Sequence, residues 1–273
     1  MTSHPPTHRT VRVVHTMGMA ISIHVLTHEQ LTSTLARDVD AAMAACADDL
    51  DTIDRLCSTY RPDSQVSRIR AGGLALEDAD ERIAQIVDAC SAAERDTGGL
   101  VSAWWDGAFD PTGVVKGWAV ERATERLLVP LLAERGVVAV GMNAGGDMQL
   151  ATAPGADWVW SVGIADPLRP GALLAVVDVV DGAVATSGVA ERGEHILDAR
   201  TGAPARGAAA ATVIADRLTT ADVWATAAVV AGVDDLAWIA DAGTRSGLVV
   251  GHDGRVRRWV GAAEIVEHSS LVG

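Results

Sequence analysis

The chain has 273 residues and a hydrophobic content of 49%, which is enough for a sizeable core in one large domain or two small ones. Its formal net charge of −14 and its pI of about 4.9 exclude nucleic acid and anionic membrane surfaces as expected partners. The first residues form no apolar signal region and no apolar run is long enough to span a membrane, so we expect a cytoplasmic protein.

The first predicted elements are a β segment and a long helix. Residues 11–26 alternate β-branched and polar side chains around Met17 and Gly18, which predicts either a bulged edge strand or a short hairpin. Residues 38–57 place apolar side chains at spacings of three and four, which is typical of an amphipathic helix. Its aspartates are expected on the solvated faces.

Two further helices are predicted before residue 100. Asp63 or Ser64 is expected to cap a short helix, and residues 78–96 form an amphipathic helix that ends at Thr97-Gly98-Gly99. Tyr60, the only tyrosine, is interpreted from the residues alone as an ordinary half-buried aromatic. The cysteines at 46, 57 and 90 lack metal-ligand spacing and are expected to be buried free thiols.

A turn from Asp110 to Gly113 leads into a helix predicted from Val114 to Glu134, with a kink expected at Pro130. Lys116 in this segment is the only lysine of the chain. A carboxylate, a hydroxyl and an ammonium thus meet at one helix N-terminus, where the helix dipole favours anions. The alternative is a capped helix with a solvated lysine.

Residues 137–142 are predicted to form a strand that runs into the sequence Asn143-Ala144-Gly145-Gly146-Asp147. One interpretation is a β-hairpin that needs a positive φ at its glycines. The other is that Gly145 and Gly146 let a planar or phosphorylated ligand approach the backbone. The residues favour neither interpretation over the other.

The rest of the chain mixes strands with helices. Residues 172–180 are apolar on both faces and are expected in the sheet interior. Residues 195–204 are expected to form a loop that contains His195. The other expected strands are 158–165, 183–187, 209–215, 246–250, 256–260 and 264–267, and the expected helices are 219–231 and 234–242. This order predicts one α+β domain over residues 1–273 with a mainly antiparallel sheet and surrounding helices, residues 1–10 being disordered.

Asp222 and Thr226 are four residues apart, so they project from one face of the last long helix. One interpretation is a capping box in which Thr219 is the N-cap and Asp222 occupies the third helical position. The other is a hard-cation site that leaves positions for phosphate oxygens and water, as Mg²⁺ sites usually do.

Several motifs occur in the order of one known family. They are MGM (17–19), STYRPDSQVSRI (58–69), DPTGVVKGWAVERA (110–123), NAGGD (143–147), WSVGIADP (160–167), ATSG (185–188), HILDARTG (195–202) and ADVWATA (221–227). In this ordered set the chain resembles the ApbE-type FAD:protein FMN transferases. Two departures are a short segment between Gly99 and Asp110 and Ala199 in place of a common proline.

The resemblance implies an ApbE-like α+β fold. It also implies an enzyme that uses FAD as substrate with Mg²⁺, transfers FMN to a Ser or Thr of a target flavoprotein and releases AMP. It implies metal ligation by Asp222, Thr226 and the Gly113 carbonyl. It implies a general base at His195 with Asp198 beside it. By position, the flavin and FAD contacts would be Met17, Tyr60, Asp110, Lys116, Asn143, Gly145, Gly146 and Ser187.

Two rival functions remain at this stage. An Mg²⁺-dependent FAD pyrophosphatase would use water in place of the target hydroxyl. A flavin-binding carrier would hold FAD without turning it over. The acceptor protein and the oligomeric state are left open by the sequence.

Overall fold

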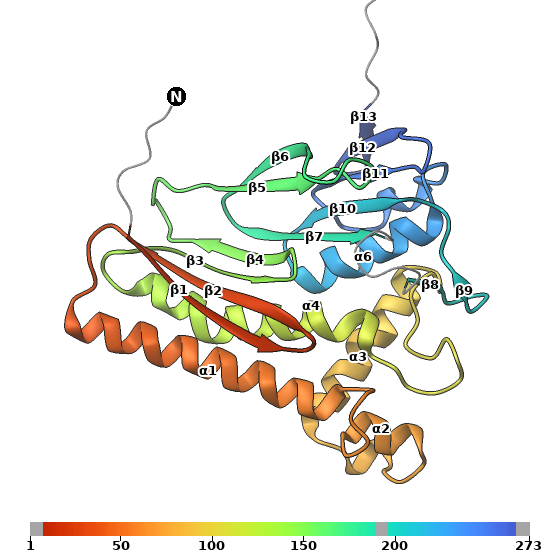
Figure 1. Ribbon diagram of the computed structural model, residues 1–273, viewed down its shortest axis with the longest axis horizontal. Coiled ribbons are helices and arrows are strands. Elements are labelled where there is room, and N and C mark those ends of the chain that lie inside the picture. Colours follow the sequence, from red (N-terminus) through yellow and green to blue (C-terminus); the bar gives the residue numbers. More distant parts are fainter. Residues whose placement is uncertain (1–7, 189–195, 266–273) are drawn as a thin grey trace, which may run out of the picture.

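The computed structural model describes residues 8–188 and 196–265, and Figure 1 shows an antiparallel sheet with helices against it. The main sheet of the described chain has nine strands, and every neighbouring pair is antiparallel. In spatial order they are β1 (His8–Thr16), β2 (Met19–Thr27), β3 (Val137–Ala144), β4 (Asp147–Thr152), β7 (Gly182–Gly188), β10 (Ala210–Ala215), β11 (Ser246–Val250), β12 (Val256–Val260) and β13 (Ala263–Ile265). The α+β class with a mainly antiparallel sheet is therefore confirmed.

The break at Met17 and Gly18 is a hairpin turn between β1 and β2. Both residues have positive φ, 53° and 72°, as a two-residue turn that matches the strand twist requires. Of the two interpretations of this segment, the hairpin is correct. Residues 8–10 were expected to be disordered, but they pair with the end of β2 and belong to β1.

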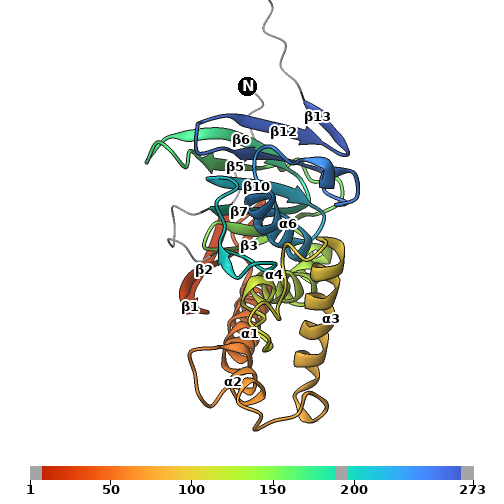
Figure 2. The same ribbon diagram turned by 90° about the vertical axis from the view of Figure 1, so that its right-hand side faces the viewer.

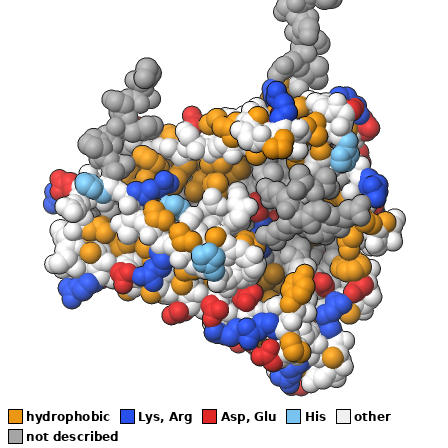
Figure 3. Space-filling view, viewed as in Figure 1, with side chains coloured by type: hydrophobic (Ala, Val, Ile, Leu, Met, Phe, Trp, Pro, Cys, Tyr) orange, Lys and Arg blue, Asp and Glu red, His pale blue; other side chains and the backbone are white. Residues whose placement is uncertain are grey.

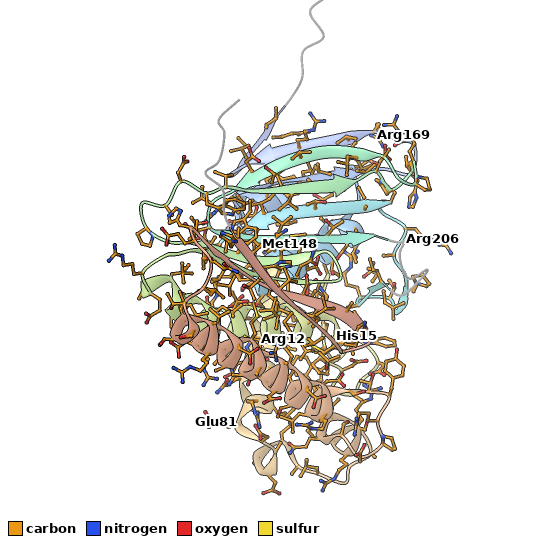
Figure 4. All side chains as sticks on the ribbon, turned by 60° about the vertical axis from the view of Figure 1, so that its left-hand side comes forward. Arg12, His15, Glu81, Met148, Arg169 and Arg206 are labelled. Atoms are coloured by element: carbon orange, nitrogen blue, oxygen red, sulfur yellow. The ribbon has the colours of Figure 1, made fainter. Side chains whose placement is uncertain are left out.

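Helices cover one face of the sheet, and Figure 2 shows α1, α3 and α4 gathered on that side. α1 (Ser33–Cys57), α3 (Glu81–Asp96), α4 (Thr112–Ala123) and α6 (Leu218–Ala231) all bury side chains in one continuous core. α1 buries the apolar side chains that its spacing predicts. Charged side chains of both signs lie along the lower edge of the molecule in Figure 3, where Figure 1 places α1. Arg12 of β1 extends toward α1 and pairs with Asp40 (Figure 4).

The shorter helices follow their local signals. Ser64 accepts a hydrogen bond from the Ser67 N–H at 3.0 Å and caps α2 (Gln65–Arg70). A single 3₁₀ turn (Leu76–Asp78) precedes α3. All three cysteines are buried and free, and burial raises the pKa of each thiol to about 12, which keeps the thiols protonated and unreactive.

The predicted helix of residues 114–134 is not uniform. α4 continues as a π-helical segment (Thr124–Leu128) and then as a 3₁₀ turn (Val129–Ala133). Pro130 has no N–H to donate, and its ring crowds the carbonyl four residues earlier, so the backbone widens one turn ahead of it. The irregularity therefore begins before the proline rather than at it.

Two sequence predictions fail in the second half of the chain. β6 (Leu173–Val179) is not inside the main sheet. Among the described strands it pairs only with β5 (Trp160–Ala165), in a hairpin on the face opposite the helices, and Leu173 and Val176 are 61% and 60% exposed. Its second apolar face therefore meets solvent.

The helix expected over residues 234–242 is only a 3₁₀ turn (Ala237–Ala240). Trp238 stacks on Trp224 with ring centroids 4.9 Å apart, and its indole N–H donates to the Asp235 carbonyl at 2.9 Å. These contacts fix a tight turn where the residue spacing alone predicts a helix. Among the described residues, none of the helices combines the length and apolar composition that crossing a membrane requires.

His24 on β2 gives the fold an acid sensitivity that can be tested. Its Nε2 bonds the Ser22 hydroxyl at 2.8 Å, and its Nδ1 is buried without a partner among the described residues. Burial, aided by Arg9, lowers the pKa of His24 from 6.5 to about 4. Between pH 6.5 and about pH 4, His24 is therefore protonated in the unfolded chain but remains neutral in the folded chain. The free energy of unfolding falls as the pH drops through this window.

We expect the free energy of unfolding to fall by about 1–2 kcal/mol less on acidification in His24→Gln than in the wild type. This value already allows for the partial exposure of the ring, which weakens the effect. Urea unfolding near pH 7.5 and near pH 4.5 measures it. His15→Gln, on the neighbouring strand, controls for the loss of a histidine. An unchanged acid-induced loss in His24→Gln would show that His24 is not the responsible group.

Candidate functional site

A cavity of about 880 Å³ opens between the sheet and the helix layer, large enough for a dinucleotide-sized ligand. Its wall combines the tip of the β1–β2 hairpin, the segments before α2 and α4, the β3–β4 turn, the end of β7 and one face of α6. Segments distant in sequence thus meet at one place.

Lys116 of α4 lies at the base of this cavity between two carboxylates. Its Nζ contacts Asp147 Oδ2 and lies 2.9 Å from Asp222 Oδ2. Asp222 Oδ2 also accepts the Gly117 N–H at 3.2 Å, and Asp147 Oδ1 accepts the Thr186 N–H at 2.8 Å. The Asp147 and Asp222 side chains are only 7% and 8% exposed, so this cluster is largely withdrawn from water.

The charges of the cluster shift the pKa values of Lys116 and Asp147. Burial lowers the pKa of Lys116, but the carboxylates of Asp222 and Asp147 raise it more, so it lies well above its usual range. Burial and the neighbouring Asp222 raise the pKa of Asp147 to about 6, against the opposing effect of Lys116. With both carboxylates ionised, one ammonium faces two negative charges, and the cluster keeps a net charge of −1.

A second ion pair holds α4 against α6 behind the cluster. Glu121, 3% exposed, accepts the Arg217 Nε at 2.7 Å and the Thr219 N–H at 2.9 Å. One turn earlier, Gly117 leaves no room for a side chain, because a Cβ there would lie 2.9 Å from Asp222 Oδ2. The two helices therefore approach closely at the level of Lys116 and Asp222.

The structure places most of the residues predicted from the sequence on the cavity wall. These are Met17, Tyr60, Asp110, Gly113, Lys116, Gly145, Ser187, Asp222 and Thr226. The Ser187 and Thr226 hydroxyls lie 3.0 Å apart, and the Asp110 carboxylate accepts both the N–H and the hydroxyl of Thr112. Tyr60 is 94% exposed, so it is not the half-buried aromatic expected from the residues alone.

Three predicted residues, Asn143, Gly146 and Asp198, do not line the cavity. The Asn143 side chain accepts the Gly146 N–H at 2.8 Å and closes the β3–β4 turn, in which Gly145 and Gly146 have φ values of 63° and 105°. Asp198 of β8 (Leu197–Asp198), which pairs with β9 (Ala203–Pro204), is bound by the Arg200 guanidinium at 2.9 and 2.8 Å. That ion pair lowers the pKa of Asp198.

His195, the predicted general base, lies outside the described residues. The capping box proposed for Thr219 and Asp222 is wrong. α6 begins at Leu218 with Arg217 as its N-cap, and no side chain of the helix caps it. Glu121 of α4 bonds the Thr219 N–H instead, which leaves Asp222 free to face Lys116.

Sequence reasoning missed Asp147 and Glu121. Asp147 ends the NAGGD motif, directly after the two glycines, and its position in a named motif was the only available signal. Glu121 follows Lys116 by five residues and shows no pattern that distinguishes it from a solvated helix charge. Their partners, Thr186 and Arg217, are far away in sequence.

The donor set suits a hard cation only in part. Among the described residues no group of three His, Cys, Asp or Glu side chains could enclose a metal. Asp222 and Thr226 nevertheless bring a carboxylate and a hydroxyl to the same cavity. Mg²⁺ commonly takes one or two carboxylates and completes its shell with water and substrate phosphates, so these residues fit a site that the substrate completes.

These features define an α+β protein whose cavity ends in a buried cluster of one lysine and two carboxylates. The family model of the ApbE family matches residues 17–112 and 105–248, so the chain belongs to the ApbE family.

Solved structures agree with this assignment at the level of the fold. The ApbE protein of Thermotoga maritima has a TM-score of 0.74 at 23% identity and covers 92% of this chain and 97% of that one. The flavin transferase ApbE of Vibrio cholerae has a TM-score of 0.71 at 18% identity and covers 93% and 97%.

A FAD:protein FMN transferase of Rhodobacter capsulatus is 36% identical over 139 residues. The match covers 46% of this chain and 26% of that protein, so it spans about a quarter of the relative's length.

Proposed function

We propose that the chain transfers FMN from FAD to a Ser or Thr hydroxyl of a target flavoprotein in a Mg²⁺-dependent reaction that releases AMP. The observation that carries this proposal is the lysine and carboxylate cluster at the base of a dinucleotide-sized cavity. Membership of the ApbE family and the similarity to the Rhodobacter capsulatus transferase support the choice of substrate.

In the proposed reaction the acceptor oxygen forms a bond to the FMN phosphorus of the FAD diphosphate. The bond between that phosphorus and the bridging oxygen breaks, AMP leaves with this oxygen, and the acceptor proton passes to a base. A hydroxyl with a pKa far above 7 needs such a base within hydrogen-bond reach. His195 stays our prediction for this role, while Asp198, bound to Arg200, is suited to orient the loop rather than to accept the proton.

Different residues of the cavity wall would bind different parts of FAD. Met17 and Tyr60, at the hairpin tip and the cavity mouth, would contact the flavin, and Asp110, Gly145 and Ser187 would line the rest of the FAD site. Lys116 and Mg²⁺ would together supply the positive charge that a diphosphate requires in a protein with a net charge of −14, because the cluster of Lys116, Asp147 and Asp222 alone keeps a net charge of −1. Asn143 would act indirectly, by holding the turn that presents Gly145.

Asp222, Thr226 and the Gly113 carbonyl would hold Mg²⁺, which when bound supplies positive charge against the diphosphate and the leaving AMP. The closeness of α4 and α6 keeps Asp222 and Lys116 in one place before substrate arrives. Much of the rate would then come from prearranged charge and from orientation of the diphosphate.

Release of AMP from FAD, followed by chromatography with Mg²⁺ and with EDTA, tests this proposal. We expect AMP to form with Mg²⁺ and to be lost with EDTA. FAD that binds tightly but yields no AMP under either condition, with or without Ser- or Thr-containing flavodomain acceptors, would contradict the proposal and favour a flavin carrier.

A further inference from the structure

The two carboxylates that contact Lys116 are not equivalent. Both oxygens of Asp147 are used by the chain itself, because Oδ1 accepts the Thr186 N–H at 2.8 Å and Oδ2 contacts Lys116. The side chain is 7% exposed. Asp147 lines the cavity as well, but each of its oxygens is already bonded within the chain, so a ligand there would have to share an oxygen with Thr186 or Lys116.

Asp222 differs in its second oxygen. Oδ2 accepts from Lys116 and from the Gly117 N–H, whereas Oδ1 makes no hydrogen bond to another described residue. Asp222 also lines the cavity beside Thr226. Of the two carboxylates that Lys116 contacts, Asp222 is thus the one with an oxygen that no described residue bonds.

The choice of a lysine at this position has a physical consequence. The chain takes its positive charge from arginine everywhere else, and an arginine would bind one carboxylate through a planar, two-point contact. The lysine ammonium is a compact charge on a flexible stem with three donors, so it can bond two acceptors and release one. Lys116 itself lines the cavity and its side chain is 21% exposed, which leaves space for this movement.

We propose that Lys116 is the resident cation of this site, that Asp147 is its permanent anchor, and that Asp222 is the carboxylate that Lys116 releases when a divalent cation binds. This inference rests on the proposed function, because it takes Asp222 and Thr226 as ligands of that cation. In the substrate-free protein the ammonium competes with the metal for Asp222. Asp147 is a positioning residue, since it acts through Lys116.

The proposal predicts opposite effects for two substitutions in one cluster. Lys116→Met removes the competing charge, so the substrate-free protein should bind Mn²⁺ about tenfold more tightly or better. Asp147→Asn releases the lysine from its anchor onto Asp222, so Mn²⁺ binding should weaken by about fivefold or more. A residue with only a structural role would not produce a gain of affinity when it is removed.

The experiment measures free Mn²⁺ by electron paramagnetic resonance during titration of each metal-free protein. Circular dichroism checks that each variant is folded. Because Lys116→Met leaves two buried carboxylates without a counter-charge, the double variant K116M/D147N is titrated as well. It keeps the formal cluster charge of the wild type, yet it should still bind Mn²⁺ more tightly, because Asp222 has lost its competitor.

Arg61→Met is the control, since Arg61 is a cation on the same cavity wall that pairs with Asp63 at 3.5 Å. Its loss should change Mn²⁺ affinity by less than about twofold, because water and salt screen an exposed charge. If neither K116M nor the double variant binds Mn²⁺ more tightly than the wild type, this inference is wrong, while the proposed function is unaffected. Absence of Mn²⁺ binding in every protein, with and without FAD, would overturn it together with the metal site of the proposed function.

Discussion

Asp222→Ala is expected to reduce Mg²⁺-dependent AMP release from FAD by about a hundredfold to a thousandfold. The substitution removes the carboxylate that the proposed site contributes to the cation and leaves only Thr226 and a backbone carbonyl as protein donors. The fold should survive, because Lys116 and Asp147 remain as a neutral buried pair. Initial rates of AMP formation across a Mg²⁺ titration measure the effect, and circular dichroism checks the fold.

Asp166→Ala provides a matched control for this substitution. Asp166 is also a buried carboxylate, with a side chain 7% exposed, and it pairs with Arg169 at 2.7 Å. Arg169 lies on the strand side of the molecule, away from the helix layer (Figure 4), and neither residue lines the cavity. AMP release should stay within about twofold of wild type in this control. Normal Mg²⁺-dependent turnover in Asp222→Ala would show that the metal assignment is wrong.

Gly117→Ala should damage the site without changing any charge. The added Cβ would lie 2.9 Å from Asp222 Oδ2 and 3.1 Å from the Leu218 carbonyl, so α6 has to move away from α4. This also breaks the hydrogen bond from the Gly117 N–H to Asp222. We expect a loss of about 1–3 kcal/mol in unfolding free energy and a fall in AMP release of about tenfold to a hundredfold.

Urea unfolding and AMP release from the same preparations measure both effects. Gly73→Ala is the control, because a Cβ there meets only the Arg68 carbonyl, at an ordinary 3.6 Å. It should change stability by less than about 1 kcal/mol and leave AMP release unchanged. Wild-type stability and turnover in Gly117→Ala would mean that the close approach of α4 and α6 does not position Asp222.

The elements that local sequence determines were predictable. The interruption at Met17 and Gly18 predicted either a bulged strand or a hairpin, and the structure shows the hairpin. The helix α1 followed from apolar side chains on one helical face. Residues 172–180 were placed wrongly because their position depends on strand pairing, which local sequence does not determine. Periodicity reports how apolar a strand is, and not which strands pair with it, so an outer hairpin and an inner strand look alike.

The candidate site shows the same limit. Spacing along one helix brings Asp222 and Thr226 to one face, and the structure places both at the cavity. Spacing alone favoured a capping box at Thr219, but in the structure Glu121 of α4 bonds the Thr219 N–H instead. Asp147 gained its importance only through folding, because Lys116 lies 31 residues before it and Thr186 lies 39 residues after it.

Covalent flavin on an acceptor protein tests the central claim most directly. The purified protein is incubated with FAD, Mg²⁺ and a panel of flavodomain acceptors that carry Ser or Thr, and each acceptor is examined by intact mass and fragment-ion spectrometry. The proposed transferase predicts one FMN phosphoester on a Ser or Thr side chain, formed together with AMP and lost in Asp222→Ala. AMP and free FMN in equal amounts, with every acceptor unmodified, would contradict transfer and identify the reaction as hydrolysis of FAD.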